Sequence, residues 1–320
     1  MKYHPSGSVL FITFTVEEGL LLQSNPLCLA IIRSCLAAAQ KLYPVRVCHI
    51  LVEATHVHLV LVVRNPDDVP GFVGHFKTES AHMLNKVLGR KKRTVWCEDY
   101  DSPKVLSLAK AMAIIPYLYS NPPKDNLVGS IEEYPGFSSW GMYQSGEHVK
   151  KWKRLRRYHF RALTPDSHNL RGYTKEAERL LGESSELETF TLEPNAWLEA
   201  FGVTEPQEQE RVNRRLVERV RTLERRAQRK REREKKTVIG RERLISQKID
   251  LTYRPSRKGK RTWCLAHKRS IRIGYIRMLK KLRQEARAVL ALWRSGDTSV
   301  RYPPGLYPPS MPKLANVLVW

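Results

Sequence analysis

Three short runs of apolar and β-branched residues stand out in the N-terminal part of the chain. They cover residues 9–16, 45–53 and 56–63, and each is bounded by polar or turn-forming residues, which predicts three strands. Only Ala54 and Thr55 separate the second run from the third. A link this short favours a hairpin, so we expect these two strands to pair antiparallel.

Two longer segments between and after these runs carry apolar residues at helical spacing. The first spans residues 26–43, with Asn25 as a suitable N-cap and Pro26 at the first helical position. The second spans residues 69–88 and is followed by Gly89, a common helix terminator.

A fourth strand is predicted at residues 94–97, followed by a helical pattern over residues 105–115. The resulting order, β-α-β-β-α-β-α, predicts an α+β fold of ferredoxin-like type. We expect an antiparallel sheet with its helices on one face.

The charge balance points to a polyanionic partner. The chain has 56 Lys and Arg residues against 32 Asp and Glu, a formal net charge of +24, which makes nucleic acid the first candidate. Five scattered cysteines without CxxC spacing suggest a reducing compartment and no zinc cage. The apolar run at 9–16 is too short to span a membrane, so we expect a cytoplasmic, nucleoid-associated protein without a membrane partner.

The third predicted strand carries the first candidate chemistry. His56 and His58 are one residue apart, and side chains at that spacing lie on the same face of a strand. Two neighbouring imidazoles can bind one metal ion, although two unrelated histidines on a half-exposed strand would give the same pattern. A metal site needs a further ligand from elsewhere in the chain.

A tyrosine-rich segment at residues 116–123 is the second candidate. If it is helical, Tyr117 and Asn121 are four residues apart and share a face, whereas Tyr119 lies on the opposite side. Pro116 is expected to kink or restart the helix, and Pro122 with Pro123 to end it. The alternative is an aromatic helix end packed in the core.

Four motifs in matching order resemble the single-tyrosine HUH transposases, and more narrowly the branch associated with repetitive extragenic palindromes. The likeness covers about the first 145 residues. The motifs are His56-Val57-His58, the stretch 96–100 (WCEDY), the stretch 117–122 (YLYSNP) and the stretch 133–139 (EYPGFSS).

The resemblance implies roles for four residues. His56, His58 and Asn121 would bind a divalent metal ion, Mg²⁺ or Mn²⁺, and Tyr117 would be the nucleophile. The reaction it implies is cleavage and rejoining of single-stranded, hairpin-bearing DNA through a 5′-phosphotyrosine. The alternative is a non-catalytic hairpin-binding protein derived from such a transposase, and a homodimer is compatible with either.

Basic residues in the N-terminal part are candidates for phosphate contacts. They are Lys77 and the cluster Arg90, Lys91, Lys92 and Arg93. Solvated Lys and Arg side chains are ordinary on helix faces and turns, so the cluster is a firmer candidate than any one member.

We expect three regions: a catalytic domain at 1–146, a basic, helical connecting region at 147–204 and a basic, mostly helical extension at 205–320. Residues 211–236 contain 13 basic and 4 acidic residues with a narrow apolar stripe through Leu216 and Val220. This helix suits a DNA backbone, which we favour, or a partner helix docked on the stripe.

Overall fold

The computed structural model describes residues 3–17, 24–91, 94–248, 262–306 and 309. The strands are β1 (Val9–Thr15), β2 (Arg46–Val52), β3 (His56–Val62), β4 (Lys104–Val105), β5 (Val149–Lys153), β6 (Leu187–Thr191) and β7 (Cys264–Leu265). The helices are α1 (Pro26–Leu42), α2 (Asp68–Val87), α3 (Leu108–Lys124), α4 (Trp140–Ser145), α5 (Leu170–Glu183), α6 (Ala196–Ala200), α7 (Pro206–Arg233), α8 (Arg241–Ser246) and α9 (Arg269–Arg294).

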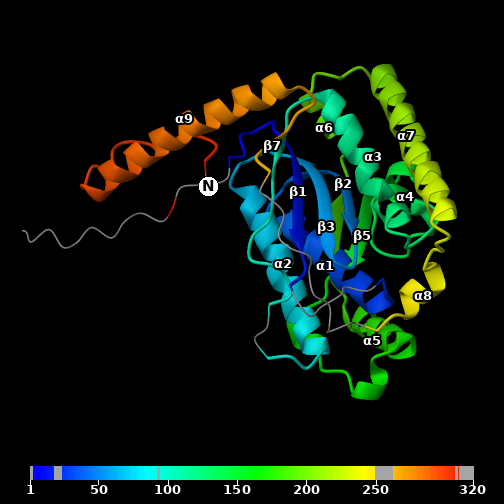
Figure 1. Ribbon diagram of the computed structural model, residues 1–320. Coiled ribbons are helices and arrows are strands. Elements are labelled where there is room, and N and C mark those ends of the chain that lie inside the picture. The colour runs from blue at the N-terminus through cyan, green and yellow to red at the C-terminus, as the bar shows by residue number, and fades with distance from the viewer. Residues whose placement is uncertain (1–2, 18–23, 92–93, 249–261, 307–308, 310–320) are drawn as a thin grey trace, which may run out of the picture.

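A five-stranded sheet in the order β2-β3-β1-β4-β7 forms the centre of the molecule (Figure 1). The pairs β2–β3, β3–β1 and β1–β4 are antiparallel, and the first six elements follow the predicted β-α-β-β-α-β order. The sheet is mixed, because β7 from the C-terminal part pairs parallel with β4. The predicted α+β class is compatible with this architecture, whereas a purely antiparallel sheet is not.

The predicted strand at 94–97 is wrong. Trp96 makes one isolated bridge to Val16, and the strand that pairs with β1 on the side away from β3 is β4, through Leu10 and Lys104. The reason lies in the Trp96 ring, which packs against Phe14 at a centroid distance of 5.1 Å. Its indole N–H donates to Ser80 Oγ over 2.9 Å, so this segment is held by side-chain packing together with the two backbone hydrogen bonds of that single bridge, Glu17 N to Val95 O and Cys97 N to Thr15 O.

Helices cover both faces of the sheet, which corrects the expectation of one covered face. Leu10 and Ile12 of β1 belong to the core that includes α1 and α2, while Val9 belongs to a second core formed with α3 and α7. Adjacent residues of a strand point to opposite faces, so β1 contributes to both cores. Leu216 and Val220 of α7, the predicted apolar stripe, are buried in the second core.

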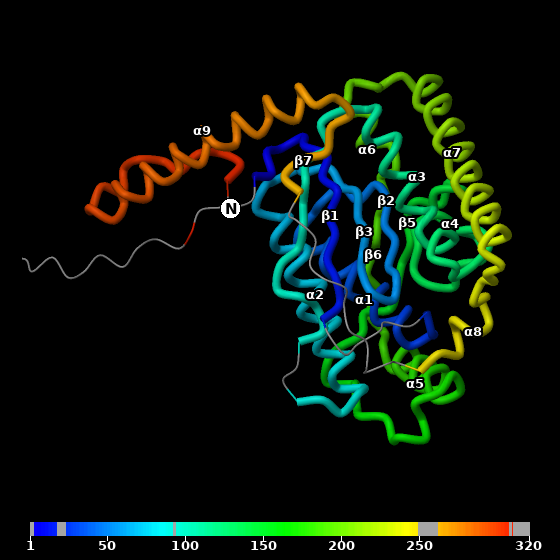
Figure 2. Tube along the Cα trace, viewed as in Figure 1, coloured from blue at the N-terminus to red at the C-terminus, as the bar shows by residue number. Residues whose placement is uncertain are grey.

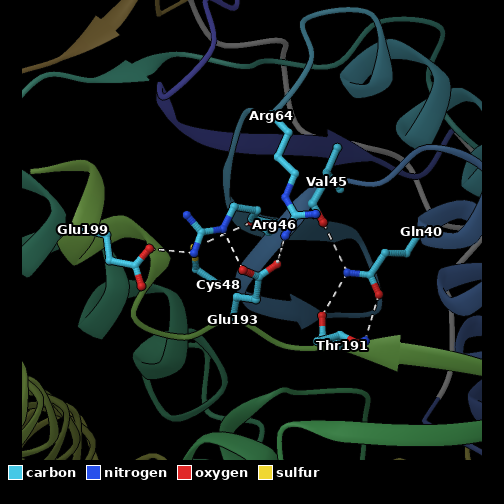
Figure 3. A network of polar contacts seen from close by, with 8 residues as sticks. All are labelled: Gln40, Val45, Arg46, Cys48, Arg64, Thr191, Glu193 and Glu199. Atoms are coloured by element: carbon cyan, nitrogen blue, oxygen red, sulfur yellow. Dashed lines mark hydrogen bonds and ion pairs between the residues drawn. The ribbon is translucent and has the colours of Figure 1, made fainter. Parts of the chain in front are cut away.

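The region 147–204 contains strands as well as helices, and it packs directly on the N-terminal fold. Figure 3 shows one connection: Arg46 at the start of β2 forms ion pairs with Glu193 and Glu199, at 2.6 and 2.7 Å. In the same network, the Gln40 amide donates to the Thr191 carbonyl over 2.9 Å. Residues 147–204 therefore share the core and polar contacts of residues 1–146.

The C-terminal helices differ in their placement. Helix α7 lies along α3, whereas α9 projects away from the body (Figures 1 and 2). Arg231 of α7 donates through Nη1 to the Pro123 carbonyl over 2.6 Å and is buried. No helix among the described residues is long and apolar enough to cross a membrane.

Candidate active site

The two histidines of the third strand lie side by side on the face of the sheet that α3 covers. The ring centroids of His56 and His58 are 4.4 Å apart, and the rings are nearly perpendicular, at 85°. His58 is buried and His56 is partly exposed. The prediction that His56 and His58 lie on the same face of the strand is thus confirmed.

Threonine hydroxyls hold one nitrogen of each ring. His56 Nδ1 is 2.7 Å from Thr55 Oγ1, and His58 Nδ1 is 3.1 Å from Thr13 Oγ1 of the neighbouring strand. Phe11 stacks on the His58 ring, with centroids 5.3 Å apart and an interplanar angle of 16°. These contacts fix both rings and direct the Nε2 atoms away from their threonine partners.

Helix α3 carries both Tyr117, whose ring lies near His58, and Asn121, whose side-chain oxygen contacts Lys124. It runs through Pro116, Pro122 and Pro123 to Lys124, so the expected restart at Pro116 and the end at Pro122 are wrong, while the kink at Pro116 stays a prediction. The missing N–H groups of these prolines remove helical hydrogen bonds. Burial of all three prolines in the second core and the bond from Arg231 to the Pro123 carbonyl support the helix in their place.

Tyr117 and Tyr119 have opposite environments. The Tyr117 side chain is 43% exposed, and its ring centroid is 6.4 Å from that of His58. Tyr119 is fully buried, with its hydroxyl 2.8 Å from His49 Nδ1 and 2.9 Å from Ser139 Oγ. Burial raises the pKa of Tyr119 well above its ordinary value, so Tyr117 alone of the two is accessible to DNA.

Lys124, the last residue of α3, lies between the two functional groups of that helix. Its Nζ atom is 2.7 Å from Asn121 Oδ1 and 3.3 Å from Tyr117 Oη. Burial lowers the pKa of Lys124, but the neighbouring Asp125 carboxylate and the Tyr117 phenol outweigh that effect and raise it overall. A positive charge therefore contacts both the phenol and the amide oxygen.

Glu53 lies on the other side of His56. Its Oε2 atom is 3.3 Å from His56 Nε2, and its side chain is buried. Burial, with a contribution from Asp125, raises the pKa of Glu53 to about 8. Glu53 therefore holds a proton near neutral pH unless a cation is bound next to it.

Both imidazoles are neutral at physiological pH. Burial lowers the pKa of His56, and burial followed by the charges of His56 and Lys124 lowers the pKa of His58 well below its usual value. Neutral imidazole is the form that binds metal ions.

The donor atoms suit a divalent cation. The two imidazoles lie side by side, Glu53 Oε2 is 3.3 Å from His56 Nε2, and buried Glu53 Oε1 has no hydrogen-bond partner in the described part of the chain. Within those same residues, no three His, Cys, Asp or Glu side chains form a metal-binding group. The Asn121 oxygen is the further ligand that the sequence resemblance implies, and Lys124, which contacts it over 2.7 Å, would compete with a cation for it.

The predicted DNA-binding residues are placed unequally. Lys77 donates to the carbonyl oxygens of Cys97 and Glu98, at 2.6 and 2.8 Å, and so holds the loop after Trp96. Lys91 is exposed, and Arg90 Nη2 lies 3.5 Å from the Thr94 carbonyl. Lys92 and Arg93 are outside the described residues. Contact between these five residues and DNA stays a prediction.

Four residues of the site were not predicted from the sequence: Thr13, Glu53, Thr55 and Lys124. Thr55 and Glu53 precede the histidine pair in the sequence, and Lys124 follows Tyr117 by two helical turns. Their closeness in the sequence to the predicted site residues could have suggested these three as members of the site. Thr13 could not be found without the register that pairs it with His58.

No protein-family model matches the sequence, and no curated protein matches it. Among solved structures, the chain is similar to a REP-associated tyrosine transposase bound to a REP hairpin. The similarity covers 45% of this chain and 84% of that chain, with a TM-score of 0.38 and 16% sequence identity. This is a distant likeness in fold over less than half of the chain.

Proposed function

We propose that this chain is a metal-dependent DNA strand transferase that cleaves and rejoins single-stranded, hairpin-bearing DNA with Tyr117 as nucleophile. The convergence of an exposed tyrosine with a pair of neutral histidines carries the proposal: the Tyr117 and His58 rings are 6.4 Å apart, although the residues come from a strand and a helix that are distant in the sequence. The four sequence motifs that resemble single-tyrosine HUH transposases support the same function.

The proposed reaction exchanges one phosphodiester for another. Tyr117 Oη attacks the phosphorus, the bond from phosphorus to the 3′-oxygen breaks, and the phenol loses the proton while the departing oxygen gains one. The products are a 5′-phosphotyrosine and a free 3′-hydroxyl. Attack by a 3′-hydroxyl on the phosphotyrosine reverses the step and rejoins DNA without a nucleotide cofactor.

The residues around Tyr117 have complementary roles in this proposal. His56, His58 and Asn121 would hold a divalent cation, Mg²⁺ or Mn²⁺, which when bound supplies positive charge to a phosphate oxygen. Thr13 and Thr55 orient the imidazoles through Nδ1. The ammonium group of Lys124 contacts Tyr117 Oη and can stabilise negative charge on that oxygen as the proton leaves.

A single-stranded substrate suits the position of Tyr117. Its hydroxyl must reach a backbone phosphate beside a folded sheet and helix, which is easier for a strand that is not stacked in a duplex. The net charge of +24 and the exposed arginines of α7 favour binding of the phosphate backbone. The hairpin specificity is part of the proposal and rests on the sequence motifs.

The test is formation of a covalent adduct. The full chain is incubated with Mn²⁺ and a 3′-end-labelled single-stranded DNA that contains a hairpin, and the products are separated on a denaturing gel. We expect a labelled protein band with the wild type and none with Tyr117→Phe. Tyr158→Phe is the control, because the Tyr158 side chain is 73% exposed and lies outside the site. Absence of an adduct from the wild type with every metal tested would contradict the proposal.

A non-catalytic hairpin-binding protein is the second candidate. The observation that favours it is the position of Lys124, whose ammonium group is hydrogen-bonded to the Asn121 oxygen that a metal would need. In that case the wild type would bind hairpin DNA with the same affinity in Mn²⁺ and in chelator, and would cleave it in neither.

A further inference from the structure

A cleft of about 460 Å³ lies beside Tyr117. Four parts of the chain line it: β1, the loop before β4, helix α3 and the segment that contains β7. Its apolar residues include Phe11, Ile114 and Leu265, and its polar residues include Thr13, Asp101 and Lys110. Tyr117 belongs both to this cleft and to the candidate active site.

The cleft and the histidine pair are connected through two residues of β1. Phe11 stacks on His58, and Thr13 contacts His58 Nδ1 over 3.1 Å. A group bound in the cleft therefore lies next to the proposed reaction centre. In a DNA strand whose phosphate is at Tyr117, the group next to that phosphate is the adjoining nucleotide.

The C-terminal half of the chain supplies one wall of the cleft. Leu265 of β7 accepts a hydrogen bond from the backbone N–H of Leu106 over 2.8 Å. His267 Nδ1 lies 2.7 Å from the hydroxyl of Ser107, the N-cap of α3. The wall is thus attached directly to the start of the helix that carries Tyr117 (Figure 2).

We propose that this cleft binds the nucleobase adjoining the phosphate that Tyr117 attacks, and that it prefers a base with an exocyclic amine (adenine, cytosine or guanine) over thymine. This inference rests on the proposed function. Phe11 and the neighbouring apolar side chains offer a stacking surface, which all bases can use. The Asp101 carboxylate accepts hydrogen bonds, and the exocyclic amine of adenine, cytosine or guanine supplies a matching donor, whereas thymine has no exocyclic amine.

The charge around the cleft fits a nucleotide better than an apolar ligand. Lys110 of α3 lines the same cleft as Asp101, so a cationic group for a phosphate and an acceptor for an amine occur together. An apolar molecule would leave both charged groups without partners. A nucleotide satisfies them through its phosphate and its base.

The experiment combines abasic DNA with a variant that fills the cleft. In the full-length Tyr117→Phe background, hairpin DNA affinity is measured by fluorescence anisotropy while each nucleotide of the single-stranded flank is replaced in turn by an abasic site. We expect an abasic site at one position to lower the DNA affinity about tenfold, which corresponds to the loss of one stacked base. Leu265→Trp should lower the affinity for intact DNA by a similar factor. When Leu265→Trp is tested with the abasic DNA, the affinity should fall no further than with either change alone.

The control variant is Leu187→Trp, because Leu187 is 53% exposed and lies on β6, outside the cleft. It should leave the abasic effect unchanged. At the sensitive position, adenine, cytosine and guanine should bind more tightly than thymine, and Asp101→Asn should reduce that difference.

The inference is overturned if no abasic position weakens binding, if the effects of Leu265→Trp and the abasic site add independently, or if Asp101→Asn leaves the base preference unchanged. Because affinity is measured without cleavage, failure of the proposed chemistry gives a different result. If the wild type forms no adduct but the effects of the abasic site and Leu265→Trp on affinity are non-additive, the base-binding cleft is supported and the catalytic function is contradicted.

Discussion

The rings of His58 and Tyr117 meet at a centroid distance of 6.4 Å, one from the central strand β3 and the other from helix α3 on the second face of the sheet. The contact depends on the helices that cover this face of the sheet. The apolar side of α3 packs on the sheet, and α7 packs along α3. The basic C-terminal part of the chain therefore contributes to the geometry of the proposed active site.

Removing both histidines should abolish cleavage without abolishing DNA binding. In the variant with His56→Ala and His58→Ala, the proposed cation loses two ligands, while phosphate contacts elsewhere are retained. We expect no covalent adduct and nearly unchanged hairpin affinity in a gel-shift assay. His82→Ala, an exposed histidine on α2, is the control. Cleavage at the wild-type rate by the double variant would contradict the proposal that His56 and His58 bind the metal ion.

Lys124→Met should strengthen metal binding. Its ammonium group contacts Asn121 Oδ1 over 2.7 Å and would compete with a cation there. The Lys124 side chain is 43% exposed, so we discount the charge effect for solvent screening to about 1 kcal/mol, or roughly fivefold in the Mn²⁺ concentration at half saturation. Electron paramagnetic resonance of free Mn²⁺ measures this directly.

Lys110→Met, at the other end of the same helix, is the matched control for Lys124→Met and should leave Mn²⁺ affinity unchanged. Equal affinities in the wild type and in Lys124→Met would mean that Asn121 does not bind the cation.

Exposed arginines of α7 should contribute to DNA binding through counterion release. Arg215, Arg219 and Arg226 are exposed and flank the stripe that is buried against α3. Replacing all three by Gln should decrease the slope of log affinity against log salt by about 2 for a single-stranded site, if each contacts one phosphate. The substitutions leave the apolar stripe intact, so the fold should be retained, unlike after deletion of α7.

The control for the α7 arginines is the same number of Gln substitutions near α5, at Arg161, Arg171 and Lys175, which are exposed and lie away from α7 (Figure 1). If both triple variants change the salt slope equally, binding follows net charge and α7 has no specific role.

Protein stability should decrease at acid pH as Glu132 becomes protonated. Partial burial raises its pKa, but hydrogen bonds from Arg221 and Trp140 outweigh this effect and lower the pKa of Glu132 to about 2 from an ordinary value of 4.5. Because the folded-state pKa is the lower one, the stabilisation is fully present above pH 4.5 and is lost as the pH falls toward 2. The carboxylate is partly exposed, so we expect about 1 kcal/mol after screening.

Urea unfolding at several pH values measures this effect. Glu132→Gln should be less stable than the wild type at neutral pH, and the difference should shrink below pH 4.5. Glu218→Gln, exposed on α7, should show no such pH-dependent difference. A constant gap between Glu132→Gln and the wild type at all pH values would refute the linkage.

Local patterns were sufficient for much of the N-terminal fold. The cap at Asn25, whose side chain accepts from Cys28 N over 2.9 Å, and the alternation along β3 are properties of short segments, so they could be predicted directly. The shared face of Tyr117 and Asn121 follows from helical spacing in the same way.

The remaining features depend on contacts between distant segments. Strands β4 and β7 have two residues each, too few for a periodic signal, and they pair only because β1 offers a free edge. The segment around Trp96 resembles a strand in composition, but its indole ring is bound by Ser80. Helix α3 continues past its prolines because α7 supports it, which no local rule predicts.

Mass spectrometry of the nucleotide-bearing peptide tests the central claim most directly. The full chain is reacted with Mn²⁺ and hairpin DNA, the DNA is digested, and peptide fragmentation locates the residual nucleotide. We predict modification of Tyr117, and we predict that Tyr119→Phe still forms the adduct, with some loss of stability because the bonds of Tyr119 to His49 and Ser139 are removed. A nucleotide on Tyr119, or on no tyrosine, would contradict the assignment of Tyr117 as the nucleophile.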